Sequence, residues 1–293
     1  MMNTCTYYTI YTGMVITIQN GNTVVRYYSL FLFCRLSKGP CAFSLARMVG
    51  GSRDGSRGHK GSAVGDSREC QRHDRESQWQ ESHSDELKSK SAKGSLHAVK
   101  CDLRNEEEIL LMFEEIKRNH GGVDVCINNA GINFHGTLLN GDTNHWRNVL
   151  DVNVLALSIC TREAVKQMME RNVDDGHIIH INSLSGYRIT PYARTHFYAG
   201  TKCMVTALGE CLRQELRELG SHIRVTRISP AYVRDTELVI RSSGGNEELV
   251  RNLNASEKAL ELRDVADMVV YALAAPPHVE INDILVRTTE QKS

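Results

Sequence analysis

Tyr198 and Lys202 are the two side chains of this sequence that are best suited to move a proton. Their spacing places both on one face of a helix, one turn apart. A free phenol has a pKa of about 10, and a nearby ammonium favours the phenolate and brings the group toward a range useful for proton transfer. Because a Tyr and a Lys fall at this spacing by chance in many chains, the alternative interpretation is a surface tyrosine on an amphipathic helix.

Other polar residues have the spacing to join that pair. Ser183 follows an apolar stretch fifteen positions before Tyr198, where its hydroxyl could hold a carbonyl oxygen, and Ser185 is a competing candidate. A serine just after a strand is also a common turn residue. Asn153 lies within an otherwise apolar helix, where an amide is costly unless it is hydrogen-bonded, so it could instead tie the helix to a loop.

The elements that must position these residues alternate between apolar strands and amphipathic helices, the pattern of an α/β protein. Strands that are apolar nearly throughout predict a parallel sheet covered on both faces, with ligands beyond the carboxyl ends of the strands. Asp102, Asn129 and Ser183 lie at those ends, although Asp102 and Asn129 could equally be a helix cap and a turn residue. We expect strands at 96–101, 123–127, 177–181, 223–228 and 281–286, and helices at 105–120, 143–171, 195–219 and 263–274.

Six short motifs follow one another along this part of the chain: CDL at 101–103, NNAG at 128–131, NVLA at 153–156, INSLSG at 181–186, YAGTK at 198–202 and SPAYV at 229–233. In this order they resemble the short-chain dehydrogenase/reductase family. Longer runs such as VTALGECLRQELRELG are similar to the branch of dehydrogenase/reductase member eleven and the farnesol dehydrogenase-like enzymes. The resemblance covers residues 86–293 and implies a Rossmann-type, doubly wound parallel sheet in a single domain.

The resemblance implies an oxidoreductase that interconverts an alcohol and a carbonyl with NADP(H) or NAD(H), of which NADP(H) is favoured. The implied substrates are hydrophobic, of the prenyl alcohol or ketosteroid type, with small dicarbonyls as a further alternative. Tyr198 would be the general acid in reduction and the base in oxidation, and Lys202 would lower its pKa and hold the nicotinamide ribose. Ser183 would polarise the substrate carbonyl, and Asn153 would position a water in the proton relay. Further cofactor contacts would come from Asp102 and Leu103 at the adenine, Asn129 at the adenosine ribose, and Val233 and Thr236 at the nicotinamide carboxamide.

The family opens with a strand, a TGxxxGxG loop and a helix, and residues 1–85 lack this pattern. Gly51, Gly55 and Gly58 have the wrong spacing for the phosphate-binding loop, and the strand and helix that should flank such a loop are missing. Residues 50–85 are almost wholly polar, so we expect them to be disordered. An altered exon or a shifted reading frame would produce such a segment, and recovery of peptides from Gly50–Asp85 of the native protein would exclude that hypothesis.

The missing opening also affects the centre of the predicted sheet. In the family's strand order, the two missing strands lie between the strands at 96–101 and 123–127. Residues 7–33 are typical of a β-hairpin with a tight turn at Asn20-Gly21. We do not expect this segment to fill the gap, because an antiparallel ribbon lacks the right-handed crossovers of a parallel sheet.

Composition excludes several other classes of protein. Lys+Arg 35 against Asp+Glu 35 argues against a nucleic-acid-binding protein. No stretch approaches the roughly 18 apolar residues of a membrane span, and we recognise no signal peptide. The nine cysteines are scattered without metal-ligand spacing, so a disulfide framework and a metal site are not expected and a cytoplasmic location is.

The resemblance also implies a homodimer or homotetramer that associates through the helices at 143–171 and 195–219. An alternative function follows from the missing loop. In that alternative the chain is a catalytically impaired relative that acts, if at all, through those same helices.

Overall fold

The structure is a computed structural model. It describes the backbone of residues 5–11, 17–19, 22–24 and 30–35, and residues 94–291 apart from 235, 244–245, 247, 249 and 252–258. The disorder that we expect for residues 50–85 therefore concerns a segment outside the described residues, as does most of the atypical segment 1–85.

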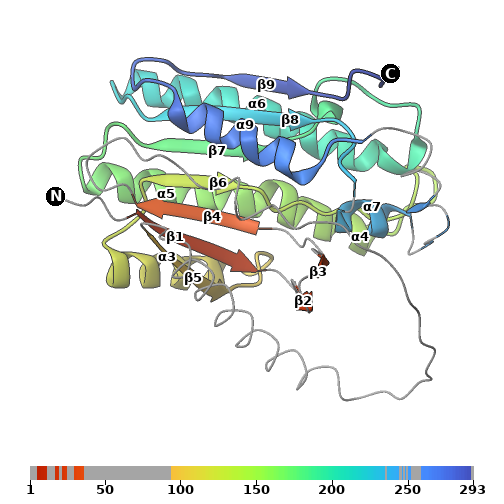
Figure 1. The fold of residues 1–293 in the computed structure, drawn as a ribbon, viewed down its shortest axis with the longest axis horizontal. Helices are drawn as coiled ribbons and strands as arrows, with labels where there is room; N and C mark the ends of the chain where they lie inside the picture. The colour runs from red at the N-terminus through yellow and green to blue at the C-terminus, as the bar shows by residue number, and fades with distance from the viewer. Residues whose placement is uncertain are drawn as a thin grey trace.

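Seven strands form one sheet (Figure 1): β1 Cys5–Tyr11, β4 Leu30–Arg35, β5 Gly94–Lys100, β6 Val125–Asn128, β7 His177–Ile181, β8 Arg224–Pro230 and β9 Asp283–Val286. Their order across the sheet is β5-β1-β4-β6-β7-β8-β9. β4 is antiparallel to both of its neighbours, and the other pairs in this sheet are parallel. The parallel Rossmann-type sheet predicted for the second part of the chain is confirmed, with its first two strands replaced.

The expectation that the N-terminal segment leaves a gap in this sheet is wrong. β1 and β4 lie between β5 and β6, with Tyr11 opposite Lys100 and Phe31 opposite Asn128. β4 runs back against β1, and an antiparallel partner needs no crossover over the face of the sheet. β1 alone pairs in parallel with β5, and the long chain segment between them provides that connection.

The predicted hairpin is present, but it is shorter than the sequence suggests. β2 (Thr17–Gln19) and β3 (Asn22–Val24) pair antiparallel, with Gln19 opposite Asn22 on either side of the predicted turn. They form a separate two-stranded sheet between β1 and β4 in the chain. The edge at which the family carries a glycine-rich loop and a helix is thus followed here by a hairpin.

Helix α3 (Glu106–His120) forms as its sequence predicts. The Asn105 side chain accepts a hydrogen bond from the Glu107 amide at 3.0 Å, and acidic residues occupy the first turn, where the helix dipole favours them. Gly121 ends the helix with a φ of 78°, in the left-handed region that glycine adopts easily. The buried face of α3 consists of Ile109, Met112, Phe113 and Ile116.

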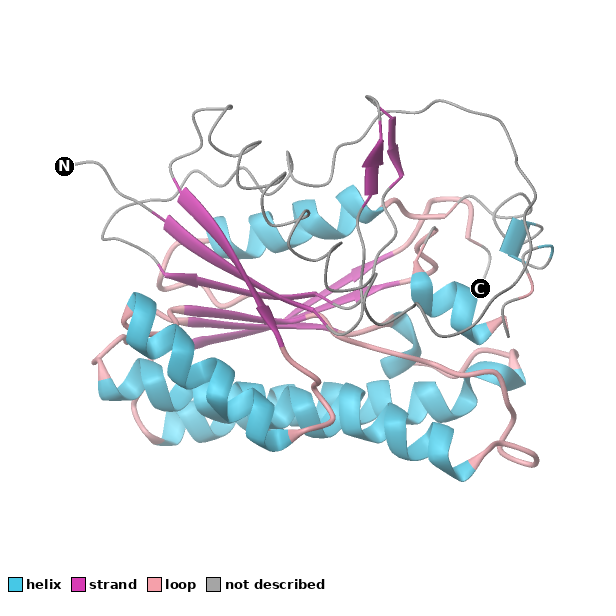
Figure 2. Cartoon of the chain, turned by 90° about the horizontal axis from the view of Figure 1, so that it is seen from below, coloured by secondary structure: helices cyan, strands magenta, loops and turns pink. Residues whose placement is uncertain are grey.

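Two hydrophobic cores hold helices on opposite faces of the sheet (Figure 2). The larger core joins the sheet to α3, α5 (Leu157–Glu170) and α6 (His196–Glu218). The smaller joins β6, β7 and β8 to α9 (Leu262–Ala274) through Val269. Because both faces are covered, the carboxyl edge of the strands is the place where polar side chains can meet a ligand.

The single helix predicted over residues 143–171 is interrupted. α4 (Thr143–Leu150) passes into a π-helical turn, Asp151–Ala156, before α5 begins. A π-helical turn holds an extra residue and occurs often at functional sites. Asn153, the amide in this apolar stretch, lies within that turn.

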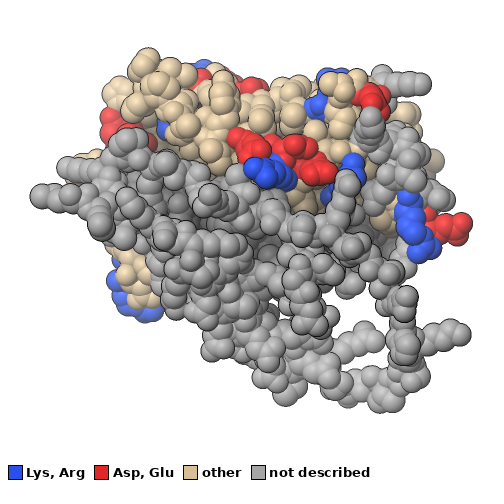
Figure 3. Space-filling view, in the orientation of Figure 1, with Lys and Arg blue, Asp and Glu red and all other residues tan. Residues whose placement is uncertain are grey.

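The described surface agrees with the mixed charge of the sequence. On the face shown in Figure 3, acidic and basic side chains of the described residues lie among one another. Within the same residues, no helix is long and apolar enough to cross a membrane. The described part of the chain also contains no group of three His, Cys, Asp or Glu side chains that could hold a metal ion.

Candidate active site

Four of the predicted site residues converge at the carboxyl edge of the sheet. Ser183 follows β7, Tyr198 and Lys202 lie in the first turns of α6, and Asn153 lies in the π-helical turn. Ser183 is hydrogen-bonded to the Tyr198 phenol. Lys202 Nζ lies 5.6 Å from the centre of the Tyr198 ring, and Asn153 Nδ2 donates to Thr201 Oγ1 at 3.1 Å.

The Tyr198–Lys202 pair is buried, so the alternative of a surface tyrosine is wrong. Tyr198 is 7% exposed and Lys202 only 3%, because the first turns of α6 pack against the end of β7. Lys202 Nζ donates to the carbonyl oxygen of Ile181, the last residue of that strand, at 2.8 Å. This bond fixes the ammonium beside the strand end.

Burial, rather than the neighbouring ammonium, dominates the pKa of Tyr198. It raises that pKa to about 12, and the hydrogen bond from Ser183 acts in the opposite direction. Burial also lowers the pKa of Lys202 to about 8. Both shifts have one cause, since a site with little water disfavours the charged form of each group. The sequence correctly predicts the pairing and misses the depth at which the pair lies.

The geometry distinguishes the two candidate serines. Ser183 Oγ accepts a hydrogen bond from the Ser185 amide at 3.1 Å and is bonded to Tyr198 as well. Ser185 lies in the short 3-10 turn Leu184–Gly186, and its carbonyl faces Cys203 Sγ at 3.7 Å. Ser183 is therefore the serine that shares an edge with the phenol.

Asn153 ties its helix to the loop after β6. Its Oδ1 accepts from the Ile132 amide at 2.8 Å, and its Nδ2 donates to the Ile132 carbonyl at 3.0 Å. The structural alternative raised for this residue is thus present in the fold. One lone pair of Oδ1 is left for a water, which is the requirement of the proposed relay.

The other predicted cofactor residues do not join this group of four. Asp102 follows β5, across β1 and β4 from β6, and its carboxylate is paired with Arg104 at 2.6 Å, which holds the pKa of Asp102 low. Leu103 is 2% exposed within the larger core, so only its backbone is available to a ligand. Asn129 is half-buried after β6, and Val233 and Thr236 lie beyond β8, where Thr236 Oγ1 donates to the Val233 carbonyl at 3.4 Å.

Sequence reasoning missed the residues that support the site from behind. Thr206 lies one turn after Lys202 on α6 and bonds to the loop that carries Ser183. Its position continues the four-residue spacing of Tyr198 and Lys202, which is the signal that could have identified it. Gly186, the last residue of the INSLSG motif, lies directly against α6.

Gly186→Ala is expected to destabilise the protein by about 1–3 kcal/mol, the usual cost of overpacking. A Cβ at this position would lie 2.7 Å from the Lys202 carbonyl oxygen and 2.8 Å from Thr206 Oγ1. Urea denaturation measures the change. Gly200→Ala is the matched control, because a Cβ there meets nothing within 4 Å and alanine favours the helix by up to about 1 kcal/mol. Equal effects of the two substitutions would contradict the packing that we describe.

Comparison with known proteins places this geometry in a family. The family model for short chain dehydrogenases matches residues 69–246. The chain is 52% identical over 206 residues to dehydrogenase/reductase SDR family member 11 of Homo sapiens, a match that covers 70% of this chain and 79% of that protein. It is 40% identical over 203 residues to farnesol dehydrogenase of Aedes aegypti, covering 69% and 78% of the two chains. The solved closed form of serine dehydrogenase complexed with NADP+ has a TM-score of 0.64 at 29% identity, covering 72% of this chain and 83% of that one.

Proposed function

The chain belongs to the short-chain dehydrogenase/reductase family, and from this we propose that it interconverts an alcohol and a carbonyl on a hydrophobic substrate with NADP(H) as cofactor. One observation carries the proposal. Tyr198, Ser183 and Lys202 meet in a buried position at the carboxyl edge of the sheet. This is the place and the set of groups that proton transfer to a carbonyl oxygen requires.

The residues at the nicotinamide end fit such a cofactor. Lys202 Nζ bonds to the Ile181 carbonyl, which leaves two of its three N–H groups for ribose hydroxyls in this part of the chain. A Cβ on Gly131 would lie 3.7 Å from both Lys202 Nζ and Asn153 Oδ1, so glycine keeps the approach to these groups open. The cofactor, when bound, would supply the hydride.

The chain's own groups would handle the proton. Tyr198 would donate its phenolic proton to the substrate oxygen in reduction and take it back in oxidation. Because burial raises the pKa of Tyr198 to about 12, the phenol stays protonated until a substrate approaches. Ser183 would hold the carbonyl oxygen beside that phenol. Asn153, fixed by both Ile132 bonds, would hold a water behind Lys202.

Several features support the finer parts of the proposal. Solved relatives at 29% and 25% identity are complexes with NADP, which favours NADP(H) over NAD(H). The farnesol dehydrogenase relative supports a prenyl alcohol, with a ketosteroid as the other candidate. Ile189 and Tyr192, 62% and 57% exposed, lie in the loop just before α6 and would meet an apolar substrate. We further propose a homodimer or homotetramer that associates through α4, α5 and α6, in the cytoplasm, without nucleic-acid partners.

One observation favours the impaired relative as a second candidate. The described elements that follow β1 are β2 and β3, at the edge where the family places its phosphate-binding loop and helix. Without a helix N-terminus, the pyrophosphate would lose a favourable set of backbone N–H donors. In that case the protein keeps its helices and its oligomer but does not turn over a cofactor.

Binding of NADPH and NADH to the full chain, measured by calorimetry, separates the two candidates. We expect binding in the micromolar range, tighter for NADPH, and oxidation of NADP+-dependent substrates to follow with farnesol or a hydroxysteroid. The oligomeric state is measured by light scattering on the same sample. A folded oligomer that binds neither nucleotide would establish the impaired relative instead.

A further inference from the structure

The loop that carries Ser183 is bonded to α6 through one threonine hydroxyl. Asn182 Nδ2 donates to Thr206 Oγ1 at 2.8 Å. The same hydroxyl is within hydrogen-bonding distance of the Gly186 carbonyl at 3.1 Å and of the Lys202 carbonyl at 3.2 Å. The residues on both sides of Ser183 are therefore attached to the helix turn that follows Lys202.

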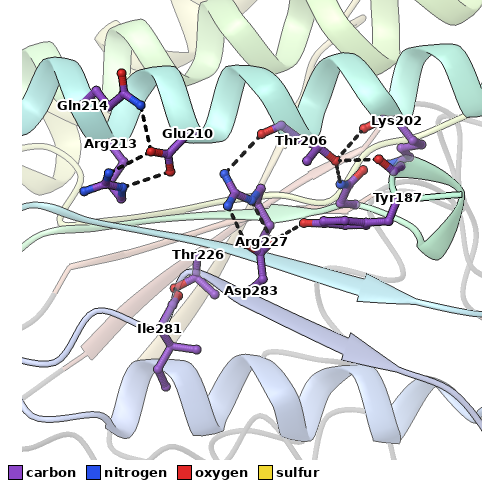
Figure 4. A network of polar contacts seen from close by, with 12 residues as sticks. Tyr187, Lys202, Thr206, Glu210, Arg213, Gln214, Thr226, Arg227, Ile281 and Asp283 are labelled. Atoms are coloured by element: carbon purple, nitrogen blue, oxygen red, sulfur yellow. Dashed lines mark hydrogen bonds and ion pairs between the residues drawn. The ribbon is translucent and has the colours of Figure 1, made fainter.

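The backbone of Thr206 is in turn bonded to β8 (Figure 4). Arg227 Nη1 donates to the Thr206 carbonyl at 3.2 Å, while Nε and Nη2 form a double bond pattern with the Asp283 carboxylate at 2.8 and 2.5 Å. The Tyr187 hydroxyl, at the end of the Ser183 loop, donates to the same carboxylate. We call Asn182, Gly186, Tyr187, Thr206, Arg227 and Asp283 the Thr206 cluster.

The ion pair in this cluster is well shielded. The Arg227 side chain is 7% exposed and that of Asp283 is 27% exposed. A buried guanidinium bonded on both sides by a carboxylate has a fixed orientation, because its planar fork matches the two oxygens. The contact from Arg227 to Thr206 therefore joins α6 to a rigid part of the sheet.

We propose that Thr206 is a positioning residue, which holds the loop of Ser183 against the Tyr198–Lys202 turns of α6. It touches neither substrate nor cofactor and acts through Asn182 and Gly186. Its effect on turnover rests on the proposed function, whereas its effect on the loop does not. Since small misplacements of a reacting group cost a large factor in rate, the loop position matters for catalysis.

Thr206→Val is the direct test, because it keeps the shape of the side chain and removes the hydroxyl. Thr161→Val is the matched control. Thr161 Oγ1 likewise donates to a carbonyl four residues earlier, at 2.7 Å, and accepts from an asparagine, Asn128 Nδ2, at 2.9 Å. Both substitutions remove one buried hydroxyl between an asparagine amide and a helix, but only one of them lies beside Ser183.

Hydrogen exchange of the Ser185 and Gly186 amides, which bond to Ser183 Oγ and Ser183 O, reports on the loop without any activity. We expect Thr206→Val to speed this exchange roughly tenfold and Thr161→Val to leave it unchanged, with recovery in Thr206→Ser. In an active protein, Thr206→Val should also lower kcat about tenfold to hundredfold at constant KM. Unchanged exchange in Thr206→Val, or equal acceleration in both valine variants, overturns the inference. A wild-type chain without turnover contradicts only the proposed function.

Discussion

Tyr198→Phe is expected to lower turnover by about a hundredfold to ten-thousandfold, the range in which a general acid–base group contributes. The substitution removes the phenolic hydroxyl and keeps the ring, which is 7% exposed and packed at the start of α6. Stability should change little, and the Lys202 ammonium should still face an aromatic ring. Steady-state kinetics with NADPH and a carbonyl substrate measures the loss.

Tyr271→Phe is the control for that experiment. Tyr271 lies on α9 and is 61% exposed, so removal of its hydroxyl should leave both turnover and stability unchanged. Cofactor affinity of Tyr198→Phe should stay within a few-fold of wild type, because Lys202 remains. If Tyr198→Phe keeps normal turnover, another group delivers the proton and our assignment is wrong.

Lys202→Met is expected to stabilise the protein by about 2 kcal/mol near neutral pH while it abolishes turnover. Burial lowers the pKa of Lys202 from 10.5 to about 8, a shift that corresponds to about 3 kcal/mol of unfavourable charge burial. Loss of the bond to the Ile181 carbonyl offsets about 1 kcal/mol of the gain. Active sites often keep such costly groups, since function needs them and stability does not.

The same residue makes stability depend on pH in a predictable direction. Between pH 8 and pH 10, folded Lys202 has released a proton that the unfolded chain still binds. Because the unfolded state then holds more protons, the free energy of unfolding should rise with pH in this window. Above pH 10 the opposite trend begins, because the folded state holds the Tyr198 proton up to about pH 12.

Urea denaturation across that range measures both signs, and Lys202→Met should lose the rise between pH 8 and pH 10. Lys166→Met is a suitable control, since the Lys166 side chain is 63% exposed on α5. A rise that persists in Lys202→Met would assign the pH dependence to another group. A flat wild-type profile would show that Lys202 is charged normally in the folded protein.

Most of the fold after residue 94 could be read from periodicity. The spans of α3, β7 and α9 agree with the sequence to within a residue or two, because each has a clear apolar face, a buried run or a capping residue. The π-helical turn around Asn153 could not be read in this way. Its wide geometry depends on the bonds from Asn153 to Ile132, a loop residue that is distant in sequence.

The sequence by itself determined the order of the motifs, the family and the pairing of Tyr198 with Lys202, because helical spacing and strand ends are local properties. Only the tertiary structure decided which serine meets the phenol, how deeply the pair is buried and what fills the centre of the sheet. Each of these depends on contacts between distant segments, such as β4 against β6 and Thr206 against the Ser183 loop. The pKa values of Tyr198 and Lys202 follow from that burial, since desolvation depends on everything packed around a group rather than on its neighbours in the chain.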